Sequence, residues 1–254
     1  MWRLRISAVN PEYFSHRVHT DAVTVLLRQL QAIADELLGR GLPAPADALR
    51  RARFRPDPPW TWCERCGVTM QERACRCRTR RAGDAAPEWI VRLGAHAGPL
   101  RSWVVDVKHA GWESMAETLG TALGQQLLDC GLISRGDRDV VIVPVPSPWL
   151  RTHSRGIDHA GAIAAAVARA CDARCCTALR QRLGATQVDA AARSGRMTRA
   201  QRFSARRCAR RIAGRHAVLV DDVRTTGSTL AEAAAVLRGA GAVRVSAAVV
   251  SVKD

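Results

Sequence analysis

The residues with the clearest chemical pattern lie in the segment Ala217–Leu230. Its first part is an apolar run typical of a buried strand, and two carboxylates, Asp221 and Asp222, follow directly. Next come a basic residue, several hydroxyl side chains and one glycine: Arg224, Thr225, Thr226, Gly227, Ser228 and Thr229. A helix that begins here would present backbone N–H groups and the positive end of its dipole to an anion, and the glycine would let a phosphate approach the backbone. The segment therefore predicts a phosphate-binding loop between a strand and a helix.

The paired carboxylates extend this prediction from a phosphate to a sugar. If the strand continues through Asp221 and Asp222, their side chains point to opposite faces; if the chain bends there, both can accept hydrogen bonds from vicinal hydroxyls. Ligands of open α/β sheets bind just outside the carboxyl ends of the strands, which is where these residues lie. A helix capped by Ser228 or Thr229 is the alternative. It would explain one hydroxyl but neither the acidic pair nor the remaining hydroxyls.

Two arginines farther upstream are candidate phosphate ligands. The run Asp139–Val145 is typical of a strand buried on both faces, and prolines end it. Arg151 and Arg155 follow that strand end and could face a pyrophosphate, because guanidinium forks match phosphate oxygens. The alternative is that both are solvated or pair with nearby acids such as Asp158.

Four of the nine cysteines lie close together, spaced as C-x2-C and then C-x-C: Cys63, Cys66, Cys75 and Cys77. No segment reaches the ~18 apolar residues of a membrane-spanning helix. The start of the chain, Met1–Arg5, lacks the apolar stretch of a secretory signal, so we expect a cytoplasmic protein. Reduced cysteines there are more often metal ligands or buried thiols than disulfide partners. Four thiolates satisfy zinc tetrahedrally, which predicts a structural zinc site. The short C-x-C half leaves a weakened site, or plain thiols, as alternatives.

The positive charge points to anionic partners. Basic residues outnumber acidic ones by 39 to 23, for a net charge of +16, and all but Lys108 and Lys253 of the basic residues are arginines. Eleven of these arginines and one acid, Asp189, fall in 177–216, which we expect to be a long loop with a helical portion. Such a segment could follow a nucleic-acid backbone. It holds a single aromatic residue, Phe203, which argues against simple base stacking. An arginine-rich genome is the alternative origin of the charge.

Alternating elements predict an α/β fold with a parallel sheet covered by helices on both faces. The expected helices and strands, in chain order, are a helix from Asp21 to Leu38, a helical segment Leu100–Leu128 broken at Gly111, the strand Asp139–Val145, the helix Ala160–Cys171, the strand Ala217–Val220, the helix Thr229–Gly239 and the strand Val243–Val252. We divide the chain into an N-terminal helical extension and linker (1–59), a zinc-ribbon-like module (60–82) and a main domain (83–254). The apolar stripe of the first helix is a packing face, which allows an oligomer.

The segment Ala217–Leu230 resembles the signature of type I phosphoribosyltransferases. The resemblance implies that Asp221 and Asp222 are catalytic and face the ribose 2- and 3-hydroxyls of phosphoribosyl pyrophosphate. It also implies that Thr225–Thr229 hold the 5-phosphate, with Arg224 beside them. A magnesium ion would bridge the pyrophosphate and the ribose, an arrangement that suits the preference of magnesium for substrate oxygens and few carboxylates.

Motifs upstream narrow the resemblance to the ComF family, phosphoribosyltransferase-fold proteins known from DNA uptake in natural competence, which carry an N-terminal zinc ribbon. The motifs that are similar, over residues 60–254, are Val143–Pro146, Arg155–Ala160, Leu179–Arg182, Thr186-Gln187, Arg193 and the loop at Asp221. Ile157-Asp158-His159 departs from the family's Phe-Asn-Gln and puts any side-chain hydrogen bond there in doubt. His159 is a candidate general base, with a helix cap or a surface residue as the alternatives.

Three functions follow from the resemblance. The first is a ComF-type protein that binds phosphoribosyl pyrophosphate or a related phosphorylated ribose, with single-stranded DNA and DNA-uptake proteins as partners. The second is an active phosphoribosyltransferase of nucleotide metabolism that acts on an unidentified acceptor. The third is a non-catalytic nucleotide sensor or single-stranded DNA-binding protein. No residue of the sequence is assigned to recognise an acceptor.

Overall fold

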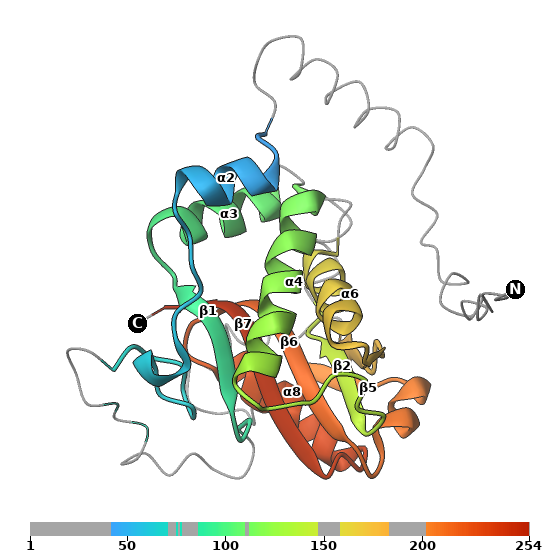
Figure 1. The fold of residues 1–254 in the computed structure, drawn as a ribbon. Coiled ribbons are helices and arrows are strands. Elements are labelled where there is room, and N and C mark those ends of the chain that lie inside the picture. Colours follow the sequence, from blue (N-terminus) through green and yellow to red (C-terminus); the bar gives the residue numbers. More distant parts are fainter. Residues whose placement is uncertain are drawn as a thin grey trace, which may run out of the picture. The chain divides into compact units, whose positions relative to one another are not determined.

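A computed structural model describes residues 42–70, 75, 77, 86–109, 112–146, 158–182 and 202–253. Contacts divide the chain into two compact units, Met1–Leu42 and Pro43–Asp254, and every described helix and strand belongs to the second. Five parallel strands form its central sheet in the order β1-β7-β6-β2-β3 (Figure 1). These strands are β1 (Ile90–Ala95), β2 (Val140–Pro144), β3 (Arg174–Cys175), β6 (His216–Arg224) and β7 (Arg244–Val252).

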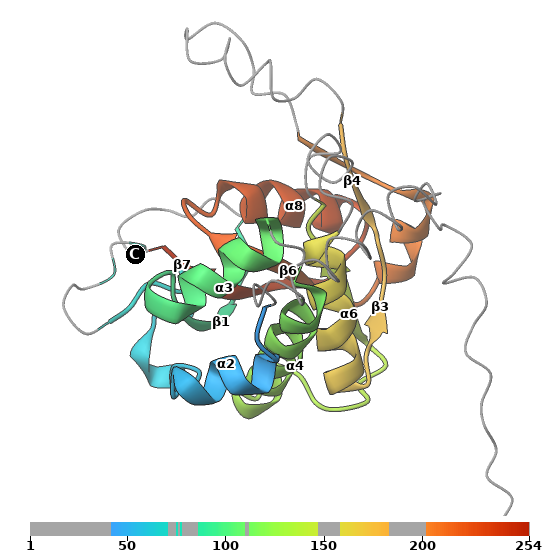
Figure 2. The same ribbon diagram turned by 90° about the horizontal axis from the view of Figure 1, so that it is seen from above.

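Helices cover both faces of this sheet, as the sequence predicts. Seen from above, α8 lies on one side of the sheet, and α2, α3, α4 and α6 lie on the other (Figure 2). Their bounds are α2 (Pro45–Arg51), α3 (Gly98–His109), α4 (Glu113–Asp129), α6 (His159–Cys171) and α8 (Ser228–Gly239), with short helices η2 (Pro59–Thr61) and η4 (Arg207–Ile212). None of the helices described is both long and apolar enough to cross a membrane.

The alternation along β6 assigns each side chain to one of two cores. Val218 and Val220 are buried with the helices α3, α4 and α6, whereas Ala217 and Leu219 are buried with α8. β6 pairs with β2 only as far as Val220 and continues against β7 up to Arg224. The last four residues of β6 therefore extend past the end of β2, at the carboxyl edge of the sheet.

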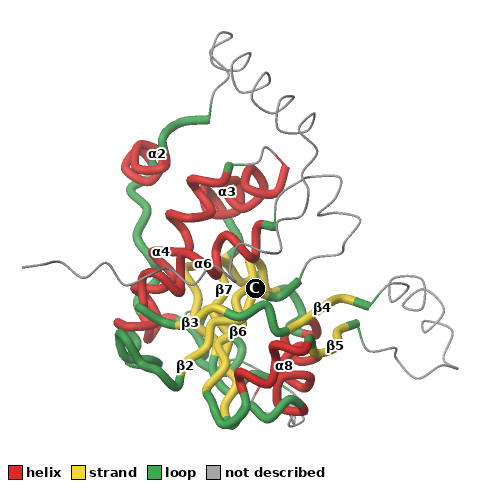
Figure 3. Tube along the Cα trace, turned by 90° about the vertical axis from the view of Figure 1, so that its right-hand side faces the viewer, coloured by secondary structure: helices red, strands yellow, loops and turns green. Residues whose placement is uncertain are grey.

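Two parts of the chain differ from the sequence-based expectation. No strand was assigned to Ile90–Ala95, an edge strand that contains the charged Arg92. In the segment 177–216, expected to be a long loop with a helical portion, β4 (Leu179–Gln181) and β5 (Phe203–Ala205) pair antiparallel beside α8, and the short helix η4 is its helical portion (Figure 3). The rest of that segment, 183–201, and the helix expected from Asp21 lie outside the described residues.

The cysteine-rich segment packs directly on the sheet. Trp62 and Thr69 form an antiparallel bridge around the Cys63–Cys66 turn. Arg92, whose side chain is 1% exposed, reaches from β1 to the Gly67 carbonyl at 2.7 Å, to the Asp57 carboxylate at 2.7 Å and to the Thr69 hydroxyl at 2.8 Å. This buried guanidinium thus ties the turn to the sheet edge. The division of the chain at residues 59 and 82 stays a prediction.

Candidate functional site

Asp221 and Asp222 lie in the extension of β6 beyond β2. Because the strand continues through both residues as far as Arg224, their side chains leave opposite faces of the sheet. Asp222 follows Val220 in the alternation and faces α3, where the Lys108 ammonium lies 2.9 Å from its Oδ2 atom. The side chains of this ion pair are 28% exposed for Lys108 and 15% for Asp222, so ligands and water can reach both.

Asp221 faces the other way and has different electrostatics. Its Oδ1 atom accepts a hydrogen bond from the backbone N–H of Asp222 at 2.9 Å. The pKa of Asp221 is raised to about 8, first by burial and then by the negative charge of Asp222, against the opposing effects of that hydrogen bond and of Lys108. At neutral pH Asp221 therefore holds its proton, whereas Asp222 is the partner of Lys108 in an ion pair.

The N-cap residue of α8 gives no side-chain cap, and at this helix start only the Ser228 N–H has a nearby acceptor among the described residues, Thr226 Oγ1 at 3.4 Å. Gly227 is the N-cap residue, with φ at 79°, and has no side chain with which to cap the first amides. Thr226 donates its hydroxyl to Ser228 Oγ at 3.1 Å and thereby folds the loop on itself. The simple alternative of a helix capped by Ser228 or Thr229 does not describe this end. Uncapped N–H groups and the helix dipole make the loop suited to an anion.

Arg224 lies over this loop and adds an unsatisfied donor to it. A Cβ atom built on Gly227 would come within 3.1 Å of Arg224 Nε, so the guanidinium covers the glycine. This Nε is buried and has no hydrogen-bond partner within the described part of the chain. An oxyanion bound at the loop would supply an acceptor to a donor that is otherwise costly to bury.

A second arginine, Arg202, contacts the same loop from the hairpin of β4 and β5. Its guanidinium forms a bidentate ion pair with Glu232 of α8, with N···O distances of 2.8 and 2.9 Å. Its Nη2 atom also donates to Ser228 Oγ at 3.1 Å. Ser228 Oγ thus accepts from both Arg202 and Thr226, and its own proton is left to donate elsewhere. Sequence analysis counted Arg202 among the basic residues of 177–216 but gave it no role.

A pocket of about 440 Å³ opens beside Asp222, at the carboxyl ends of β1, β6 and β7. Its lining consists of His96, Arg101, Val104, Val105, Lys108, Asp222, Val223, Thr225 and Lys253. Burial lowers the pKa of His96, and the positive charges of Lys108 and Arg101 lower it further. Sequence reasoning missed the basic residues of this pocket. One signal could have found two of them: Lys108 and Lys253 are the only lysines among 39 basic residues.

The structure describes only some of the other residues that the sequence predicts at the site. Arg151 and Arg155, together with Gln187 and Arg193, lie outside the described residues. Asp158 caps α6 by accepting a hydrogen bond from Gly161 N at 3.0 Å, and the next residue, His159, is buried. His159 is therefore neither the cap nor a surface residue.

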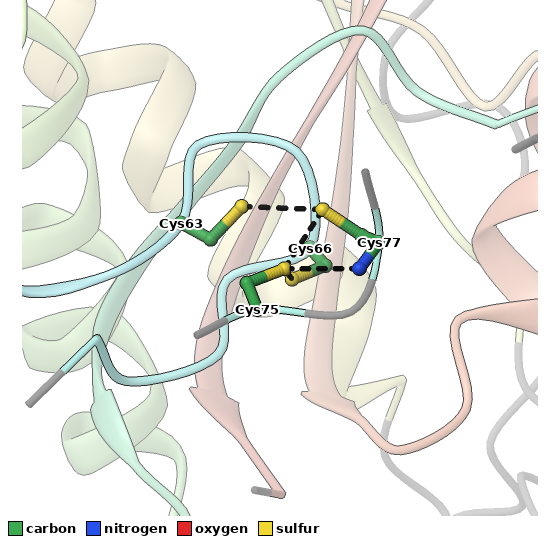
Figure 4. A group of neighbouring side chains, drawn as sticks. All are labelled: Cys63, Cys66, Cys75 and Cys77. Carbon is green, nitrogen blue, oxygen red and sulfur yellow. Dashed lines mark hydrogen bonds between the residues drawn. The ribbon is translucent and has the colours of Figure 1, made fainter. Parts of the chain in front are cut away.

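The four cysteines converge, as their spacing predicts (Figure 4). Their sulfur atoms all lie within 4.8 Å of one another, with Cys63–Cys77 at 3.4 Å and Cys66–Cys75 at 3.0 Å. Four thiolates around one zinc ion would stand roughly 3.8 Å apart, given the zinc–sulfur distance of about 2.3 Å. The cluster could therefore hold a metal ion. Within the described residues no other group of cysteine, histidine or acidic side chains is arranged in this way.

Comparison with known proteins agrees with this geometry. The phosphoribosyl transferase domain family matches residues 157–253. DNA utilization protein YhgH of Escherichia coli (strain K12) is 31% identical over 192 residues, which are 73% of this chain and 82% of that protein. The proteins of the same name from Escherichia coli O157:H7 and Shigella flexneri are each 30% identical over 190 residues, covering 73% of this chain and 81% of theirs.

Among solved structures, the structure of the allosteric regulatory enzyme of purine biosynthesis is similar with a TM-score of 0.34 and 21% identity, over 52% of this chain and 25% of that one. The parallel sheet, the loop after β6 and the domain match together define a phosphoribosyltransferase-fold protein. Within that class, the chain belongs to the ComF family, and the YhgH proteins are its relatives.

Proposed function

We propose that this protein binds phosphoribosyl pyrophosphate, or a related phosphorylated ribose, at the carboxyl end of β6. The observation that carries the proposal is the start of α8 at Gly227, which offers no side-chain cap and follows the carboxylate of Asp222 after a short turn. Thr225–Thr229 hold the 5-phosphate through backbone amides and hydroxyls. Asp222 accepts hydrogen bonds from the ribose hydroxyls. Arg224, whose buried Nε lacks an acceptor, donates to the phosphate.

The remaining predicted residues complete this proposal. Asp221 supports Asp222 through the backbone hydrogen bond between them, and in a catalytic protein the two are the acidic residues of the reaction. Arg151 and Arg155 contact the pyrophosphate. Magnesium fits the donor set, since it takes one or two protein carboxylates and otherwise phosphate oxygens and water. When bound, magnesium neutralises part of the pyrophosphate charge. Asp222 is the carboxylate that would bind the ion.

The biological setting that we infer is DNA uptake or processing in the cytoplasm. The relatives are named DNA utilization proteins, and the family is known from DNA uptake. Exposed arginines on and beside η4 support single-stranded DNA as a partner: Arg206, Arg207, Arg210 and Arg211. Positive side chains in such a row bind a phosphate backbone without reading its sequence. DNA-uptake proteins are further proposed partners.

We further propose that Cys63, Cys66, Cys75 and Cys77 hold a structural zinc ion. The convergence of their sulfur atoms supports this, and so does the link that Arg92 makes between the Cys63–Cys66 turn and β1. Zinc bound there would close the turn and contribute to folding.

An active phosphoribosyltransferase is the second candidate, and the pocket beside Asp222 favours it. A transferase needs room for an acceptor next to the ribose, and about 440 Å³ is enough for a small organic molecule. The contribution of the chain would be positioning and electrostatics: the loop and Asp222 orient the ribose, and the arginines stabilise the departing pyrophosphate.

Isothermal titration of the full chain with phosphoribosyl pyrophosphate, with and without magnesium, tests the first proposal. We expect saturable binding that requires magnesium, and weaker binding of ribose 5-phosphate, which lacks the pyrophosphate. Magnesium-dependent binding followed by pyrophosphate release with one of a set of candidate bases would favour the transferase. A protein that binds neither phosphorylated ribose would refute the proposed site.

A further inference from the structure

The pocket between α3 and the carboxyl ends of β1, β6 and β7 carries an excess of positive charge. Arg101, Lys108 and Lys253 line it together with a single acid, Asp222. Lys108 is paired with that acid at 2.9 Å. In the part of the chain that the structure describes, no salt bridge involves Arg101 or Lys253. Arg101 and Lys253 are thus exposed cations at the rim of the pocket with no ion-pair partner among the described residues, an arrangement that attracts anions.

The choice of basic residue singles out this pocket from the rest of the surface. The chain uses arginine at 37 of its 39 basic positions, and both lysines line the pocket. Three of the 39 basic positions line the pocket. If the two lysines were placed at random among the 39, both would line the pocket in only three of the 741 possible pairs. Lysine offers a compact ammonium, whereas arginine offers a planar fork. The two exceptions to the general use of arginine thus place compact positive charges in the same pocket.

Backbone and side-chain contacts position two residues of the pocket lining, Lys253 and His96. Lys253 donates its backbone N–H to the carbonyl oxygen of Arg224 at 2.8 Å, so the residue is anchored to the end of β6. His96 is held by Ser251, with 2.9 Å between Nδ1 and Oγ. The lowered pKa of His96 reflects burial first and then the positive charges of Lys108 and Arg101. A negative charge bound in the pocket would therefore raise the pKa of His96.

The pocket also has an apolar side. Val104 is buried in α3, its neighbour Val105 is 42% exposed, and Val223 of β6 lines the pocket with them. A bare inorganic anion would leave these side chains against water. An organic molecule that combines a small apolar body with one oxyanion would use both parts of the lining.

We propose that this pocket binds a second ligand, a small organic molecule whose carboxylate or phosphate is held by Lys253, Lys108 and Arg101. The oxyanion lies between the two lysines, and the apolar body rests on the valines of α3 and β6. The proposal goes beyond phosphorylated-ribose binding and rests on it only in that Asp222 is common to both sites. If the protein is a transferase, this ligand is the acceptor, and its acidic group is what the pocket recognises.

Titration of the full chain with benzoate, phenyl phosphate and benzamide, at low ionic strength and without phosphorylated ribose, tests the proposal. These probes share an aromatic body and differ in charge. We expect at least one of the two anions to bind about tenfold more tightly than the neutral benzamide, the ratio expected for one charge-assisted hydrogen bond. The anion that binds more tightly identifies the group, carboxylate or phosphate, that the pocket prefers. The pKa of His96, followed by NMR, should rise when that anion binds.

Lys253→Met should weaken binding of the anion by about fivefold or more, and Lys253→Arg should restore it only in part because the fork does not replace the point charge. Arg138→Gln is the matched control, since it removes one exposed positive charge just before β2, at the opposite edge of the sheet. Equal binding of anions and benzamide, an equal loss in Arg138→Gln, or binding of inorganic pyrophosphate alone would overturn the proposal. If the protein binds the anions but does not bind phosphoribosyl pyrophosphate, the proposed anion pocket is supported and the proposed ribose site is refuted.

Discussion

Substitution of each carboxylate by its amide, Asp222→Asn and Asp221→Asn, separates the roles that the structure gives to two adjacent residues. Asp222 is charged and reachable, so the loss of its charge-assisted hydrogen bond to the ribose should cost about 1.5–3 kcal/mol of binding free energy. This equals an increase in Kd of roughly 10- to 150-fold. Asp221 holds its proton at neutral pH, because its pKa is raised to about 8, and its neutral amide should change Kd less than about threefold.

The same two variants should differ in stability. Asp222→Asn removes the partner of Lys108, but both side chains are partly exposed, so the cost is at most about 1 kcal/mol of unfolding free energy. Asp221→Asn should stabilise the protein. The folded-state pKa of Asp221 lies above its ordinary value of 3.8, so its contribution to stability is present below pH 3.8 and is lost as pH rises through 8. The advantage of the amide should therefore grow between those two values.

Calorimetric titration with phosphoribosyl pyrophosphate and magnesium at pH 7, and urea unfolding of the parent and both variants at several pH values, measure these effects. Each variant is the isosteric control for the other. If Asp221→Asn weakened ligand binding as much as Asp222→Asn, both carboxylates would reach the ribose. The assignment of the two side chains to opposite faces of the sheet would then be wrong.

Three other predictions follow from contacts in the structure. Arg202→Gln should weaken binding of ribose 5-phosphate by about 1–2 kcal/mol, because it removes the donor that fixes the Ser228 hydroxyl. Glu232→Gln should not weaken this binding, and Arg180→Gln, a change in the same hairpin, should have no effect. Calorimetric titration of the three variants with ribose 5-phosphate checks the prediction. Purified protein should contain about one zinc ion per chain by elemental analysis, and Cys66→Ser should lower both the zinc content and the melting temperature. Arg92→Met should cost about 3 kcal/mol in urea unfolding because it leaves a buried carbonyl oxygen and a carboxylate without their donor; a loss under 0.5 kcal/mol would contradict this.

The strand, loop and helix around Asp221 could be predicted from the sequence because all of their parts are contiguous. A strand, a carboxylate pair, a glycine and a helix follow one another within Ala217–Gly239, and each leaves its own pattern. The direction of the two carboxylates could not be predicted, because it depends on whether β6 continues. That depends in turn on its pairing with β7 through Arg224, a contact between separate segments.

The pocket could not be predicted because its lining comes from four separate places. His96 follows β1, which sequence analysis did not assign; Arg101 and Lys108 lie on α3; Asp222 is in β6; and Lys253 follows β7. Of these residues only Asp222 belongs to a motif that the sequence shows. Arg202 was missed for a similar reason, since its contact with Ser228 depends on a hairpin whose two strands are separated by about twenty residues of chain.

In our proposals the positive charge of this chain serves two surfaces, one formed by arginines alone and one that contains both lysines beside Arg101. The exposed arginines of η4 belong to the face of the sheet that α8 covers, because Ala209 and Ile212 of η4 are buried in the core on that side. The lysines line a pocket on the other face, against α3. Arginine forks suit a repeating phosphate backbone, and a pair of compact ammonium groups suits one small oxyanion. Binding of a polyanion at η4 would leave the pocket open, so one chain could hold a nucleic acid and a small ligand at the same time.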